Sequence, residues 1–161
     1  MNPSFDTGAS ANRDGKQTVI VRAEALASGS ASGPKILLAE PLSFWGGYDA
    51  ARGLIVEQTH PAFGRSLART IMVMPHAKGS SSSSSVLAEA IRNGTGPAGI
   101  VLRERDLIIA IGVIVAGELY GLSVPLVVVG DRDFDTVCGE GATISIDAPR
   151  ENGPALVTLT R

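Results

Sequence analysis

The chain has little of several features that small proteins use for binding and stability. It has one cysteine, Cys138, so it forms no internal disulfide and no metal site from several of its own thiolates. We expect a structural cysteine; the alternative is one ligand of a cluster shared with another chain. Aromatic residues make up only 4%, and basic residues are scattered in a chain of net charge −2. This composition favours a compact domain over a nucleic-acid-binding surface.

The sequence also lacks a long hydrophobic run. The longest, residues 107–115, is flanked by Asp106 and Glu118 and falls short of the roughly 20 residues that cross a bilayer. Residues 1–17 have no apolar signal-peptide core and are rich in Ser, Asn, Asp and Gly, which predicts a flexible tail. We therefore expect a cytoplasmic protein with this tail and one folded domain, residues 18–161.

Apolar spacing predicts alternating strands and helices in the middle of the chain. Strands at 70–74, 99–102 and 126–129 are separated by helices at 86–93 and 106–120. That order predicts parallel strands with right-handed crossovers. Further short strands are expected at 18–21, 35–39, 53–58, 143–146 and 155–159, the last two antiparallel, with a small-residue connector at 27–33. The expected fold class is α/β, a parallel strand–helix–strand core with additional β-strands.

Six consecutive serines, residues 80–85, follow Lys78-Gly79 between a predicted strand and a predicted helix. Such a turn gathers backbone N–H groups and hydroxyls at a helix N-terminus, where anions bind. Ser80 is the catalytic candidate, because a helix N-terminus and a nearby cation both favour a serine alkoxide. The candidate substrate contacts are Lys78, Gly79, Ser81, Ser82 and Ser83. The alternative is that all six serines cap the helix or fill the loop.

The tract is not a nucleotide-binding P-loop, because Lys78-Gly79-Ser80 has the wrong order and no upstream glycine. His60 and His76 could act as general acids or bases, although histidines in turns are more often only solvated or hydrogen-bonded. Four arginines could reach a carboxylate or a partner surface: Arg52, Arg65, Arg69 and Arg103.

Aspartates at 131, 133 and 135 alternate as calcium ligands do. An EF-hand loop further requires a glycine after the third aspartate and a glutamate at its end. Thr136 and Ala142 stand at those places, so a solvated acidic turn is expected and no metal site is assigned to this chain.

Four stretches together resemble the small subunit of aconitase X, which is the swivelling domain of the aconitase superfamily. They are Glu-Pro-Leu-Ser-Phe-Trp-Gly-Gly at 40–47, His-Pro at 60–61, Lys-Gly-Ser-Ser at 78–81 and Pro-Ala-Gly-Ile-Val at 97–101. The resemblance runs from about Val19 to the C-terminus. It implies a swivelling β/β/α domain and a hydro-lyase reaction on a small hydroxy acid. Ser80 matches the serine that acts as catalytic base in aconitase-like enzymes.

The resemblance also implies a heterodimer with a large subunit that holds most of an iron–sulfur cluster, with Ser80 facing it across the interface. Bacterial members dehydrate cis-3-hydroxy-L-proline to pyrroline-2-carboxylate, and archaeal members dehydrate mevalonate 5-phosphate. Archaeal small subunits tend to carry Lys-Gly-Ser-Thr and then a non-serine residue, so the unbroken serine run and long polar tail favour hydroxyproline. The alternatives are a mevalonate-5-phosphate dehydratase small subunit and a non-catalytic swivel-like interaction module.

Overall fold

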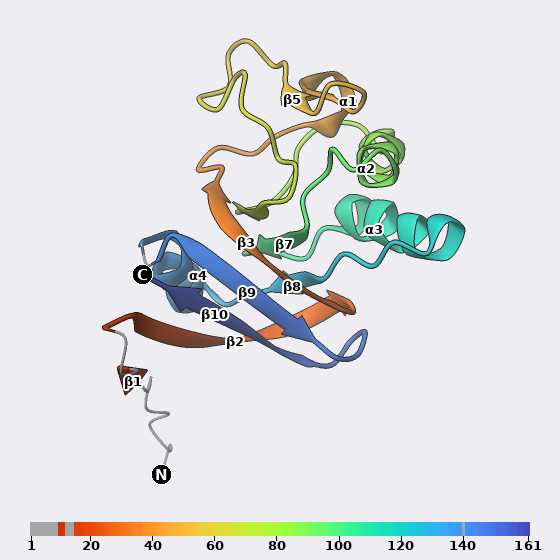
Figure 1. The fold of residues 1–161 in the computed structure, drawn as a ribbon. Coiled ribbons are helices and arrows are strands. Elements are labelled where there is room, and N and C mark those ends of the chain that lie inside the picture. The colour runs from red at the N-terminus through yellow and green to blue at the C-terminus, as the bar shows by residue number, and fades with distance from the viewer. Residues whose placement is uncertain (1–9, 12–14, 140) are drawn as a thin grey trace.

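A computed structural model describes residues 10–11, 15–139 and 141–161 of the chain. Its main sheet has the strand order β1-β2-β10-β9-β3-β6-β7-β8, and β8 also pairs with β2, so the sheet curls back on itself (Figure 1). The strands are β1 Ser10–Ala11, β2 Gln17–Ala27, β3 Gly29–Leu37, β4 Tyr48–Asp49, β5 Leu54–Ile55, β6 Ile71–Met74, β7 Gly99–Leu102, β8 Leu126–Val128, β9 Thr143–Ala148 and β10 Pro154–Thr160. The helices are α1 Phe44–Gly47, α2 Ser83–Arg92, α3 Leu107–Tyr120 and α4 Asp131–Gly139.

The predicted parallel core is confirmed. Strands β3, β6, β7 and β8 pair in parallel, with α2 between β6 and β7 and α3 between β7 and β8. The carboxylate of Asp106 caps α3 by accepting the N–H groups of Ile108 and Ile109, both at 3.0 Å. Gly121 ends the helix with φ +65°, a left-handed conformation that glycine adopts without strain.

Successive residues of the parallel strands face two different apolar cores, as the two-residue period of a strand requires. Met72 and Met74 lie with α2 and α3 in the first core. Ile71 and Val73 lie in the second core, inside the curled sheet, together with Phe134 of α4. The mixed sheet with helices on its parallel half confirms the expected fold class.

The antiparallel half of the sheet is more extensive than predicted. Strands β9 and β10 pair antiparallel as expected, but the expected connector at 27–33 is wrong, because residues 29–33 belong to β3 and pair with β9 from Ala148 to Ile144. The small residues there allow close packing. A Cβ at Gly33 would lie 2.7 Å from the carbonyl oxygen of Arg69.

The expected acidic turn is also wrong, since residues 131–139 form helix α4. Asp131 and Asp133 lie in its first turn, where carboxylates are favoured by the helix dipole. Phe134 and Val137, three residues apart on one face, are its buried residues.

The described part of the expected flexible tail includes β1, in which Ser10 and Ala11 pair with Thr18 and Gln17 of β2. Residues 1–9 and 12–14 lie outside the described residues, so the flexibility of the tail stays a prediction. Within the part of the chain that the structure describes, no helix is long and apolar enough to cross a membrane.

Residues 38–70, which connect β3 to β6, carry only the short elements α1, β4 and β5 and lie beside α2 (Figure 1). The predicted strand at 53–58 is reduced to Leu54–Ile55. The connection is held by side chains in the first core, and by Tyr48, whose hydroxyl donates to Thr95 O at 2.5 Å and accepts from Leu67 N at 3.2 Å. The 38–70 connection is therefore held in place beside α2.

Candidate active site

The serine tract lies in the loop between β6 and α2, at the carboxyl end of the parallel strands. Loops at the carboxyl ends of parallel strands carry ligand sites in both open and closed α/β folds. The predicted strand-to-helix turn is confirmed, because β6 ends at Met74 and α2 begins at Ser83. Ser80 and Ser81 are exposed, and Ser82 is half-buried.

The hydroxyl of Ser80 is held by the turn itself. Its Oγ accepts the N–H of Ser82 at 3.1 Å, while its carbonyl oxygen accepts the N–H of Ser83 at 3.0 Å. An N–H that donates to Oγ stabilises negative charge on that oxygen. Within the described ranges, no group accepts a hydrogen bond from the N–H of Gly79, Ser80 or Ser81. The turn thus offers three open donors next to Ser80.

The last three serines have structural contacts. Ser83 is completely buried, and its Oγ accepts the N–H of Trp45 at 3.0 Å. The hydroxyls of Ser84 and Ser85 donate to the carbonyl oxygens three residues earlier, at 2.9 and 2.8 Å, as serines in the first turn of a helix do. The burial of Ser83 separates it from Ser81 and Ser82, whose side chains face solvent at least in part.

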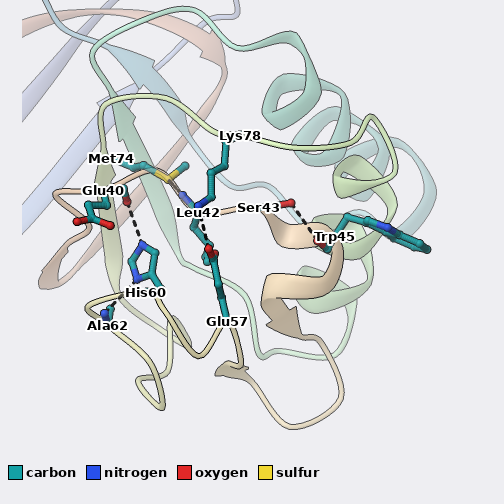
Figure 2. Close-up of polar contacts among 9 residues, drawn as sticks. All are labelled: Glu40, Leu42, Ser43, Trp45, Glu57, His60, Ala62, Met74 and Lys78. Carbon is teal, nitrogen blue, oxygen red and sulfur yellow. Dashed lines mark hydrogen bonds and ion pairs between the residues drawn. The ribbon is translucent and has the colours of Figure 1, made fainter.

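Gly79 lies against the 38–70 connection. Its φ is +95°, and a Cβ there would be 2.2 Å from Ser43 Oγ and 2.9 Å from Ser43 Cβ. Ser43 Oγ donates to Trp45 O at 3.0 Å, and the N–H of Lys78 points to Leu42 O at 3.4 Å (Figure 2). The serine turn and residues 42–45 therefore form one packed unit.

Lys78 is paired with a residue that the sequence analysis missed. Its Nζ lies 2.8 Å from Glu57 Oε1, although 47% of the lysine side chain is exposed (Figure 2). Glu57 Oε2 is buried and finds no hydrogen-bond partner among the described residues. No local pattern pointed to Glu57, because only the path of the 38–70 connection brings it to Lys78.

The two histidines have different surroundings. His60 is buried, and its Nδ1 accepts the N–H of Ala62 at 3.0 Å. Its Nε2 therefore carries the proton and donates to Glu40 O at 3.0 Å, so the interpretation as a hydrogen-bonded turn histidine is confirmed. His76 donates from Nδ1 to Ala77 O at 2.8 Å and lines a cavity of about 430 Å³.

Arg103 and Cys138 line the same cavity as His76. The guanidinium carbon of Arg103 lies 5.8 Å from the ring centre of Phe134, and its Nε is 4.0 Å from Asp131. Burial raises the pKa of the Cys138 thiol, which disfavours its thiolate form. Among the residues with described positions, no group of three or more His, Cys, Asp or Glu could hold a metal ion.

Residues 20–153 match the model of the aconitase X swivel domain. The chain belongs to this family. It is 42% identical to the cis-3-hydroxy-L-proline dehydratase of Pseudomonas aeruginosa over 120 residues. The matched segment covers 74% of this chain but only 20% of that protein. It is 33% identical over 123 residues to the phosphomevalonate dehydratase small subunit of Methanothermobacter thermautotrophicus, covering 76% of this chain and 89% of that subunit.

A crystal structure of Thermococcus kodakaraensis aconitase X in its holo-form has the same fold. A chain of that structure superposes with a TM-score of 0.69 at 26% identity, over 86% of this chain and 97% of that chain. The resemblance that the motifs at 40–47 and 78–81 indicated is thus confirmed for the family and for the fold.

Proposed function

We propose that this chain is the small subunit of a dehydratase that works with a large partner subunit and removes water from cis-3-hydroxy-L-proline. The observation that carries the proposal is the turn itself, with exposed Ser80, the Ser82 N–H on its Oγ and three open N–H donors beside it. Two relatives named cis-3-hydroxy-L-proline dehydratase are 42% and 38% identical to the chain, against 33% for the phosphomevalonate subunit of Methanothermobacter.

In the proposed reaction, Ser80 Oγ takes the proton from the carbon next to the substrate carboxylate. The electron pair of that C–H bond forms the new double bond, and the hydroxyl group leaves from the neighbouring carbon. The resulting enamine tautomerises to pyrroline-2-carboxylate. The Ser82 N–H favours the basic form of Ser80, because it donates to the oxygen that must hold negative charge.

The substrate carboxylate would be held by the open N–H groups of Gly79, Ser80 and Ser81 and by the hydroxyls of Ser81 and Ser82. Ser83 would support the turn through its bond to Trp45. Lys78 would have to exchange Glu57 for the carboxylate in order to bind the substrate directly.

An iron–sulfur cluster, if the enzyme uses one as the family implies, does not fit the described residues of this chain. They contain no group of three or more His, Cys, Asp or Glu that could hold a metal ion, and they offer a single thiol, Cys138. We therefore assign the cluster to the proposed large subunit.

A second candidate function is the small subunit of a phosphomevalonate dehydratase. It is favoured by the fact that the chain spans 89% of the Methanothermobacter small subunit, whereas it spans 20% of the Pseudomonas dehydratase. Coverage of the relative thus favours the archaeal subunits, while sequence identity favours the hydroxyproline enzymes.

The test is to assay the co-expressed pair of subunits with both substrates. Ser80→Ala should leave assembly intact and lower turnover of the preferred substrate by about 100-fold or more, the usual contribution of a general base. The matched control is Ser85→Ala, because that exposed hydroxyl bonds only to Ser82 O. Full turnover by the Ser80 variant would contradict the assignment of the base. A chain that is stable alone, with no partner and no activity, would favour the non-catalytic module.

A further inference from the structure

Helix α3 has an apolar stripe on its solvent side. Leu107, Ile111 and Ile114 are 78%, 51% and 38% exposed, and their spacing of four and three residues places them on one face. The opposite face, with Ile109 and Val113, is buried in the first core. Exposed apolar side chains grouped on one face are a feature of protein interaction sites.

This stripe adjoins the serine turn. The carboxylate of Asp106, the residue before Leu107, accepts the N–H of Ala77 at 3.1 Å. Further along α3, Gly112 packs so closely on α2 that a Cβ would lie 2.9 Å from Ser84 O. The two helices lie side by side in Figure 1. The first turns of α3 are thus fixed against both ends of the loop that carries Ser80.

Trp45 adds a large apolar side chain to the same region. Its backbone N–H is bonded to Ser83, yet 58% of the residue is exposed. Figure 2 shows the indole directed away from the other labelled residues. A tryptophan exposed to this extent is typical of an interface anchor.

We propose that Trp45, Leu107, Ile111 and Ile114 form the surface on which the large subunit docks. The proposal rests on the function proposed above. The Pseudomonas relative carries about four-fifths of its length outside the part that this chain matches. Under the function proposed above, that remainder corresponds to the large subunit, which is the partner the surface would meet. A large subunit that closes over exposed Ser80 also has to cover the apolar side chains fixed to the same turn.

Trp45, Leu107, Ile111 and Ile114 are uncharged, while the same face of α3 continues to the exposed carboxylate of Glu118. We therefore expect an apolar surface on the large subunit opposite these four side chains. A second copy of this chain would compete for the same surface. Its binding would leave Ser80 without the remainder of the active site, so the large subunit is the occupant that the site requires.

The experiment measures binding between the purified small subunit and the large aconitase X subunit of the same organism by isothermal titration calorimetry. The double variant Leu107→Lys/Ile111→Lys should weaken binding by about 100-fold or more, since two apolar anchors are replaced by charges. The matched control is Leu156→Lys, at a residue that is 44% exposed on β10 in the antiparallel half of the sheet. It should bind within about threefold of the unchanged chain, as a residue outside the interface does.

A second readout separates docking from catalysis. Excess large subunit should restore turnover in the double variant but not in Ser80→Ala. Equal unfolding midpoints of the variants and the unchanged chain would show that the substitutions leave the fold intact. Normal binding by the double variant would overturn the proposed docking surface. The proposed function would still stand if the unchanged pair of subunits is active. The docking surface would also be overturned if the double variant lost self-association but kept its affinity for the large subunit. If the unchanged proteins neither pair nor show activity, both proposals are overturned.

Discussion

Replacement of Gly79 by alanine tests how the serine turn is held. At φ +95° an alanine is strained, at a cost of about 1–2 kcal/mol. The new Cβ would also lie 2.2 Å from Ser43 Oγ and 2.9 Å from Ser43 Cβ. The hydroxyl can rotate away if it gives up its bond to Trp45 O, but Cβ is attached to the backbone and moves only with it. Overpacking of this kind adds about 1–3 kcal/mol, so we expect a total loss of about 2–5 kcal/mol.

A double-mutant cycle separates the two contributions. In a Ser43→Gly background, the nearest remaining atom of residue 43 is Cα, at an ordinary contact distance of 3.9 Å. Gly79→Ala should then cost only the backbone strain of about 1–2 kcal/mol. The free energy of unfolding in urea, measured for the four chains, gives the coupling of about 1–3 kcal/mol that the steric contact predicts.

The control is Gly94→Ala. Gly94 also has a positive φ, +73°, but a Cβ there meets no atom within 4 Å. Its substitution should cost about 1–2 kcal/mol in both backgrounds. If Gly79→Ala costs the same with and without the Ser43 side chain, the close approach of these two residues is not the reason for the glycine.

Two further predictions concern a helix cap and a thiol. Asp106→Ala should lower the free energy of unfolding in urea by about 1–2 kcal/mol, because the N–H groups of Ile108, Ile109 and Ala77 lose their acceptor; no change would contradict the capping role. Because burial raises the pKa of Cys138, the unfolded chain deprotonates first, so stability should fall as pH rises through the thiol range relative to a Cys138→Ala chain. Iodoacetamide should likewise react with folded Cys138 at a higher pH midpoint than with the unfolded chain, and equal midpoints would refute the shift.

The parallel half of the fold could be predicted because its signals are local. The cap at Asp106 and the stop at Gly121 lie within or beside the helix that they delimit. The first half of β3 could not be predicted in this way, because its partner β9 begins at Thr143, more than a hundred residues later in the chain. Helix α4 was missed because the three aspartates dominate its pattern, although the buried pair Phe134 and Val137 was visible in the sequence.

The candidate site likewise combines residues that local sequence signals predict with residues that they do not. Ser80 follows from a strand, a glycine and a helix that are neighbours in sequence. Its supports, Ser43 and Glu57, come from a connection with little regular structure, whose path no periodicity specifies. The pairing of Lys78 with Glu57 shows the consequence, because a lysine expected to face a ligand has a carboxylate partner within its own chain.

The stretches at 40–47 and 78–81, two of the four that carry the family resemblance, contact each other directly. A Cβ at Gly79 would overlap the side chain of Ser43, and the Trp45 N–H donates to Ser83 Oγ at the start of α2. The two stretches therefore constrain each other's conformation. A substitution on one side therefore demands a matching change on the other, as Gly79→Ala should demand Ser43→Gly. The two stretches are a single tertiary contact, and this contact holds the proposed base in place.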